Sequence, residues 1–169
     1  MTPESMTDVD ACRTGLGGLR CVLPGSRGTS CGKANECDDG GVSKEAIRTE
    51  KAPAPFQGAP YSQAIVHGDL VFVSGQLGID AATNEVVQGG VAAQTERALE
   101  NVQAILEEAG SSLAKVLQAS IFLIDLQDFG AMNEVYARYM GDVFPARATV
   151  QISALPSGAR IEIAAVAHR

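Results

Sequence analysis

Two segments of the chain carry apolar side chains at intervals of three and four residues, the spacing that gathers them on one face of an α-helix. The longer segment spans residues 91–109 and is followed by Gly110, where a helix C-cap is expected. The shorter one spans residues 125–140, with Asn133 beside its apolar stripe. The stripes are Val91, Thr95, Ala98, Leu99, Val102, Ile105, Leu106 and Ala109 in the first segment, and Phe129, Met132, Tyr136, Tyr139 and Met140 in the second.

Other segments alternate apolar and non-apolar residues with the period of a β-strand. Residues 61–66 and 70–74 predict a hairpin, and His67 is interpreted as a turn residue, not as a catalytic base. Residues 115–124 predict a long strand. One face of this strand is wholly apolar, so we expect helices to cover it; that face is Leu117, Ala119, Ile121 and Leu123.

Two connecting segments carry turn or extended signals. Residues 47–60 contain three prolines and predict an extended lead-in to the first hairpin. Residues 80–85 contain Thr83–Asn84 and predict a further turn before the first helix.

The C-terminal stretch predicts two more strands joined by a turn at residues 155–158, which contain Pro156 and Gly158. In the second strand Glu162 lies opposite an apolar face. The first strand points Arg147, Thr149, Gln151 and Ser153 to one side. An arginine and a glutamate thus stand on strands with otherwise short, mostly uncharged side chains. The pattern alone leaves two interpretations open: solvated surface charges, or charges mounted on a rigid sheet for function.

The element order β-β-α-β-α-β-β predicts an α+β layer sandwich, with two helices on one face of a mixed sheet. The other face, to which we assign Arg147, Gln151 and Glu162, has too many small and apolar residues for an ordinary wet surface. We therefore expect this face to line a subunit interface, with binding sites in its clefts.

Residues 1–41 differ from the rest of the chain and predict a disordered N-terminal extension before a domain at 42–169. All four cysteines lie there without C-x-x-C spacing or a neighbouring histidine, which argues against a zinc site; they are Cys12, Cys21, Cys31 and Cys37. No signal peptide is recognisable, so we expect a reducing cytoplasm and free thiols. One hypothesis is that the natural protein starts at Val42, because a valine codon can initiate translation and composition changes abruptly there.

Composition argues against several classes of partner. With 13 basic and 20 acidic side chains the net charge is −7, a poor match for a phosphate backbone, so no nucleic-acid partner is expected. The chain has no Trp, five Phe and three Tyr, too few aromatic residues to favour a stacking platform for single strands. No apolar run approaches the length that would span a membrane, so no membrane partner is expected either.

Six short motifs in a fixed order resemble the Rid/YjgF family of reactive-intermediate deaminases, over about 42–169. Each motif is weak alone, but six in this order are specific. The motifs are A-P-Y-S-Q-A from Ala59, V-S-G-Q from Val73, Q-x-x-x-A-L-x-N-V from Gln94, D-F-x-x-M-N from Asp128, F-P-A-R-A-T-V from Phe144, and I-E-I from Ile161.

The resemblance implies a chorismate-mutase-like fold and a homotrimer with three inter-subunit clefts. It implies hydrolysis of 2-imino acids such as 2-iminopropanoate and 2-iminobutanoate, which arise from pyridoxal-phosphate enzymes acting on serine and threonine. The products would be the 2-keto acid and ammonia, and no metal or organic cofactor is implied.

The resemblance also implies roles for two charged residues. Arg147 matches the family's arginine, and a guanidinium fork suits a carboxylate, so we expect it to anchor the substrate. Glu162 matches the family's glutamate and is expected to orient or deprotonate the attacking water. The alternative for Glu162 is a structural ion pair with Arg160 or Arg147.

Further residues of the resemblance are expected to complete the pocket. Tyr61 would form its wall, with simple packing as the alternative; Gly75 would offer backbone groups close to the ligand, and Ser74 a hydroxyl. Asn133 would hold the cleft through its amide, unless it is only a helix-surface residue. Thr149 stands where many relatives carry a cysteine, so a reactive-thiol mechanism is not supported, although its hydroxyl can bind a carboxylate or water.

One geometric problem accompanies this assignment. In a plain hairpin centred on 156–157, Glu162 lies opposite Gln151, which is four residues or about 13 Å from Arg147. Either the register is offset or the two charges serve one cleft in another way.

The sequence leaves two alternative functions. One is an endoribonuclease, which is disfavoured by the acidic charge and by the lack of a suitably placed histidine pair. The other is a non-enzymatic trimer that binds small carboxylates or regulates a partner enzyme.

Overall fold

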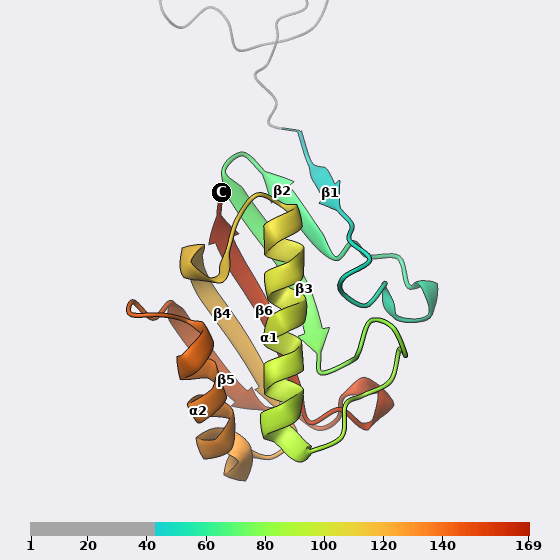
Figure 1. The fold of residues 1–169 in the computed structure, drawn as a ribbon, viewed down its shortest axis with the longest axis vertical. Coiled ribbons are helices and arrows are strands. Elements are labelled where there is room, and N and C mark those ends of the chain that lie inside the picture. Colours follow the sequence, from blue (N-terminus) through green and yellow to red (C-terminus); the bar gives the residue numbers. More distant parts are fainter. Residues whose placement is uncertain (1–42) are drawn as a thin grey trace, which may run out of the picture. The chain divides into compact units, whose positions relative to one another are not determined.

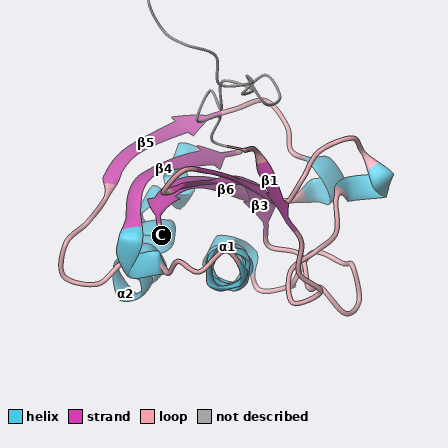
Figure 2. Cartoon of the chain, turned by 90° about the horizontal axis from the view of Figure 1, so that it is seen from above, coloured by secondary structure: helices cyan, strands magenta, loops and turns pink. Residues whose placement is uncertain are grey.

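The computed structural model describes residues 43–169, which form one mixed sheet covered on one face by two helices (Figure 1). The predictions for the N-terminal extension and its cysteines lie outside the described residues. Seen from above, both helices lie on the same side of the sheet (Figure 2). The elements are β1 (Glu45–Ile47), β2 (Ala64–His67), β3 (Leu70–Leu77), α1 (Gly90–Glu108), β4 (Val116–Leu123), α2 (Phe129–Tyr139), β5 (Ala146–Gln151) and β6 (Ile161–His168). The predicted α+β class is confirmed.

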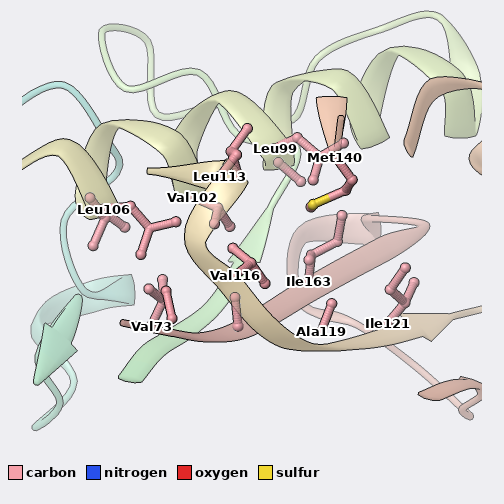
Figure 3. Close-up of a cluster of buried hydrophobic side chains, with 14 of the residues drawn as sticks. Val73, Leu99, Val102, Leu106, Leu113, Val116, Ala119, Ile121, Met140 and Ile163 are labelled. Carbon is pink, nitrogen blue, oxygen red and sulfur yellow. The ribbon is translucent and has the colours of Figure 1, made fainter. Parts of the chain in front are cut away.

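Helix α1 forms where the apolar spacing predicted it, and its stripe is buried against the sheet (Figure 3). Gly110 adopts a positive φ of 77°, and Ser111 N–H donates to the carbonyl of Leu106 at 2.8 Å, which caps the helix end. Helix α2 is shorter than predicted. Residues Leu126–Asp128 form a separate 3-10 turn, because the Asp125 carboxylate accepts the N–H of Gln127 and starts that turn.

The sheet order is β1-β2-β3-β6-β4-β5, and every neighbouring pair is antiparallel except β4 and β5. The predicted β2–β3 hairpin and the turn at 80–85 are present; in that turn Asp80 N–H donates to the carbonyl of Glu85. A short edge strand that the sequence did not predict, β1, precedes the lead-in and pairs with β2.

We predicted that helices cover one whole face of β4, and this prediction is wrong for the first residue of that face. Leu117 is exposed, whereas Ala119, Ile121 and Leu123 are fully buried as predicted. The register of β4 against β6 shifts between Val116 and Gln118, so a bulge turns Leu117 outward and Val116 takes the buried place.

The predicted hairpin of the last two strands is also wrong. Strand β4 lies between β5 and β6: it pairs antiparallel with β6 and parallel with β5, with α2 as the crossover. Arg147 is aligned with Ala119 on the helix-covered face, whereas Glu162 is aligned with Phe122 on the open face. The assignment of Arg147 and Gln151 to the open face is therefore corrected, and within one chain the two charges lie on opposite faces of the sheet.

Candidate functional site

Helix α2 holds the guanidinium of Arg147 in a defined place at the edge of the sheet. Arg147 Nη1 donates to Asn133 Oδ1 at 2.7 Å. The guanidinium carbon lies 4.8 Å from the ring centroid of Tyr136 and 5.5 Å from that of Phe129, within the range of cation–π attraction. Residues 129, 133 and 136 share one helical face by their spacing. We call Arg147, Asn133, Phe129, Tyr136 and Thr149 the arginine half-site.

A cavity of about 400 Å³ opens beside this guanidinium. Among residues 43–169, no carboxylate lies within ion-pair distance of Arg147, and Asn133 is the one hydrogen-bond partner of its guanidinium. Most of its five N–H donors thus remain available for an incoming acid. The cavity is lined by Asn133, Tyr136, Ala137, Phe144, Pro145 and Arg147.

Two hydroxyls of the arginine half-site, those of Thr149 and Tyr136, are buried and have no hydrogen-bond partner among residues 43–169. Thr149 follows Arg147 by two residues on β5 and therefore faces the same side. Burial raises the pKa of Tyr136, and the charge of Arg147 opposes that rise. The Tyr136 hydroxyl is therefore neutral around pH 7. Neither hydroxyl is satisfied by the part of the chain that the structure describes.

Glu162 lies beside a bulge in β3 on the open face. Two residues of β3, Ser74 and Gly75, stand opposite the single position between Ala165 and Ile163 of β6. A Cβ atom added to Gly75 would collide with the carboxylate of Glu162, so only glycine allows this close approach.

The residues around Glu162 form the second half of the candidate site. The Ser74 hydroxyl donates to the carbonyl of Ser62 at 2.7 Å, and the Tyr61 hydroxyl accepts the N–H of Phe56 at 2.7 Å. Tyr61 and Gly75 line one small cavity of about 40 Å³. We call Glu162, Gly75, Ser74 and Tyr61 the glutamate half-site.

The carboxylate of Glu162 is half-buried, and this desolvation raises its pKa above the ordinary value. The ion pair with Arg160 that was weighed as an alternative is not formed. Arg160 instead binds Asp128 through two hydrogen bonds of 2.9 and 2.7 Å. Across the part of the chain that the structure describes, Glu162 has no ion-pair partner.

The structure thus brings the predicted site residues together in two groups instead of one. Phe129 and Tyr136 were predicted only as apolar core positions of a helix. Their spacing around Asn133 on the same helical face was the signal that could have identified them as a support for Arg147. Phe129 is 38% exposed, which is high for a core position.

The open face of the sheet, which also carries Glu162, has an exposed apolar surface. Large apolar side chains on it are 38–49% exposed; they are Leu70, Phe72, Leu117 and Val150. Helices cover only the opposite face (Figure 2). Apolar surface of this extent on one sheet face is typical of an interaction surface.

Two absences are limited to the described part of the chain. No helix within it is long and apolar enough to cross a membrane. No three His, Cys, Asp or Glu side chains gather there in a way that could hold a metal ion.

Comparison with known proteins places the chain in a family. The family described as Endoribonuclease L-PSP matches residues 49–169. A RutC family protein of Pyrococcus abyssi is 50% identical over 128 residues, which cover 76% of this chain and 99% of that protein. A 2-iminobutanoate/2-iminopropanoate deaminase of Bos taurus is 44% identical, covering 73% of this chain and 89% of the relative.

A solved structure of E. coli TdcF with bound serine superposes with a TM-score of 0.70 at 36% identity, covering 74% of this chain and 98% of that one. Residues 49–169, which the family model matches, include both half-sites. The resemblance predicted from six motifs is confirmed, and the chain belongs to the Rid/YjgF family.

Proposed function

We propose that this protein hydrolyses reactive 2-imino acids, such as 2-iminopropanoate and 2-iminobutanoate, to 2-keto acids and ammonia. The observation that carries the proposal is Arg147: a guanidinium fixed by two aromatic rings and one amide, beside a cavity, with most of its donors unused. Such a fork fits the carboxylate that every 2-imino acid carries. Relatives with the name of this activity are 44% identical to the chain.

The mechanism needs only water and the chain's own residues. Arg147 binds the substrate carboxylate and orients the imine, while Thr149 and Asn133 complete that end of the cleft. Water adds to the imine carbon, giving its proton to Glu162, which returns a proton to the nitrogen. The hydroxyl proton of the resulting carbinolamine then passes through Glu162 to the amine nitrogen, the C–N bond breaks to release ammonia, and the carbonyl of the keto acid forms. No oxidation or reduction occurs, so the reaction requires no redox cofactor.

The two half-sites are proposed to meet between copies of the chain. Arg147 and Glu162 lie on opposite faces of one sheet, so a single chain does not offer both to one small substrate. The apolar open face around Glu162 is the surface that a second copy would cover. Contacts between two different patches of the same chain can close into a ring. We propose a homotrimer with three such clefts. In each cleft one copy supplies the glutamate half-site, which is Tyr61, Ser74, Gly75 and Glu162, and another copy supplies the arginine half-site.

The description of the family as an endoribonuclease raises a second activity that the chain's chemistry does not favour. The chain carries a net charge of −7, which repels a phosphate backbone. His67 and His168 do fall in one row across the sheet, but Leu70 stands between them.

The proposal is tested by coupling a threonine dehydratase to the purified protein and following 2-ketobutanoate. Native protein is expected to accelerate keto-acid formation over the spontaneous rate. Arg147→Ala removes a charge-assisted pair of about 3 kcal/mol, so kcat/KM is expected to fall about 100-fold. Arg138→Ala is the matched control, because Arg138 lies on α2 in only a long, exposed contact with Glu96.

Two results would overturn the deaminase proposal. One is a native protein that does not accelerate imine loss; the other is an Arg147→Ala variant as fast as the native chain. Binding of 2-ketobutanoate without any acceleration would instead favour the non-enzymatic carboxylate-binding trimer.

A further inference from the structure

Four buried amide side chains have no role in the chemistry proposed above. They are Gln63, Gln76, Gln94 and Asn101, all 1–6% exposed. Buried amides are costly unless they are hydrogen-bonded, and each of these four binds backbone groups. The backbone groups all belong to segments that frame the glutamate half-site.

Gln76 binds the bulge itself. Its Nε2 donates to the carbonyl of Ser74 at 3.0 Å and lies 3.2 Å from the carbonyl of Gly75. These carbonyls belong to the two bulge residues, which stand opposite one position of β6 and interrupt the ladder of strand hydrogen bonds. Gln76 therefore fixes the backbone at the point where it approaches Glu162 most closely.

Helix α1 contributes two of the amides. Asn101 Nδ2 donates to the carbonyls of Leu77 at 3.1 Å and Ile79 at 2.9 Å, and Leu77 is the residue directly across from Glu162. Gln94 Oε1 accepts the N–H of Arg160 at 2.8 Å, two residues before Glu162. Helix α1 thus binds the end of β3 and the residue just before β6, the strand that carries Glu162.

The packing of α1 against this region leaves little space. A Cβ atom on Gly78 would lie 2.6 Å from the Cα of Gln94, so strand end and helix are in backbone contact there. The sequence separations of 22–66 residues show that these bonds join distant parts of the chain and are not local helix or turn bonds.

Gln63 holds the segment that leads to Tyr61. Its Nε2 reaches the carbonyls of Thr49, Ala52 and Pro53 at 2.9–3.1 Å, and its Oε1 accepts the N–H of Thr49 at 2.7 Å. The carbonyl of Gln63 accepts the N–H of Ser74, which connects this segment to the bulge.

We propose that Gln63, Gln76, Gln94 and Asn101 form a scaffold of positioning residues that holds the glutamate half-site in its reactive geometry. This inference rests on the proposed function, because it assigns to the scaffold the task of fixing Glu162 for water activation. The arginine half-site is held differently, by side chains of α2 that point at Arg147 directly. Damage to the scaffold should therefore lower kcat and leave substrate anchoring by Arg147 intact.

The test uses the full chain in its native assembly and the variants Gln94→Met and Gln76→Met, which keep volume but lose the backbone hydrogen bonds. The matched control is Gln103→Met on the same helix, where Gln103 binds only Glu107 at the surface. We expect kcat to fall about tenfold with KM changed less than about twofold. Gln94→Glu keeps an acceptor for Arg160 N–H and should recover most of the loss.

Amide hydrogen exchange followed by mass spectrometry supplies a readout that does not depend on activity. Exchange at residues 74–79 and 160–162 is expected to quicken about tenfold in Gln94→Met or Gln76→Met, while α2 keeps its native rate. Exchange that quickens equally everywhere, or nowhere, would overturn the scaffold, as would a loss confined to KM. If one variant does not fold, the kinetics and the hydrogen exchange of the other variant test the scaffold.

The proposed function and the scaffold can each be overturned without the other. A native protein without imine hydrolysis would overturn the proposed function, and the exchange data would still show whether these amides hold the glutamate half-site. Normal hydrolysis with unchanged exchange and kcat in both variants would overturn the scaffold alone.

Discussion

The two half-sites differ in how the fold holds a charge. Arg147 stands on the edge strand β5, exposed, with aromatic rings and an amide from one helix around it. Glu162 stands on the central strand β6, is half-buried and has no charged partner among the described residues. It lies beside a bulge whose backbone is hydrogen-bonded by buried amide side chains. The guanidinium of Arg147 therefore has hydrogen-bond donors available for an acid, whereas the carboxylate of Glu162 is partly desolvated and lies close to backbone atoms.

The difference indicates that the two residues have different functions, substrate binding for Arg147 and proton transfer for Glu162. A guanidinium stays charged in any such environment and is suited to binding. A carboxylate whose pKa is raised by burial is a better proton acceptor and is suited to proton transfer. The variants below separate these two functions, from the largest expected effect to the smallest.

Glu162→Gln is expected to lower kcat about 100-fold with little change in KM, because it removes the proton acceptor but leaves the carboxylate anchor. In the native protein, activity should fall as the pH drops through the raised pKa of Glu162, so the acidic limb of kcat/KM lies above the ordinary glutamate value of 4.5. A steady-state pH profile measures both effects. Equal kcat in variant and native protein would remove Glu162 from the mechanism.

The same substitution makes a prediction about stability. Because the folded pKa of Glu162 is raised, the unfolded chain releases this proton at lower pH than the folded protein does. Stability is therefore lost as the pH rises from the ordinary value through the raised one, and Glu162→Gln avoids that loss. Thermal unfolding should show a higher Tm for the variant at pH 7 and a shrinking difference below pH 4.5. A lower Tm at pH 7 would argue against desolvation as the cause.

Gly75→Ala is expected to lower kcat about 30-fold, because the new methyl group displaces the carboxylate of Glu162. Gly130→Ala is the matched control: Gly130 lies in α2 with open space at its Cβ position. The control should keep native kinetics and gain a little helix stability. Native kcat in Gly75→Ala would show that the close approach of Glu162 to Gly75 is not required.

Much of the fold follows from local patterns, but the placement of the two charges does not. The spacing of apolar residues predicts α1 and the buried face of β4 because each pattern reports burial of its own segment. The position of β4 between β5 and β6 depends on pairing among strands distant in sequence. Arg147 was consequently assigned to the wrong face. Bulges at Leu117 and Gly75 likewise depend on pairing.

Phe129→Leu is expected to raise KM about threefold with kcat unchanged, because it removes a cation–π contact of about 0.5–1 kcal/mol that holds the guanidinium of Arg147. Initial rates across a range of imino acid concentrations separate the two parameters. A fall in kcat without a change in KM would assign Phe129 to the chemical step instead of to anchoring.

Thr149→Val is expected to have the smallest effect. The variant removes a buried hydroxyl that lacks a partner, so the free energy of unfolding should stay the same or rise by up to about 1 kcal/mol. In the assembled cleft the hydroxyl is proposed to help bind the substrate, and its loss should raise KM about twofold. Denaturant unfolding and steady-state kinetics on one preparation test both statements. A clear loss of stability would show that the hydroxyl is satisfied in the native assembly.

Mixed assemblies of two inactive variants test most directly that the cleft is shared between copies. Arg147→Ala and Glu162→Gln chains, co-expressed with different tags and purified through both, should contain some clefts with an intact Arg147 and an intact Glu162. A trimer that contains both variants has one native cleft out of three, so the doubly purified complexes should regain about a third of the native rate. Complexes that stay as inactive as each parent would contradict a cleft built from the arginine half-site of one copy and the glutamate half-site of the next.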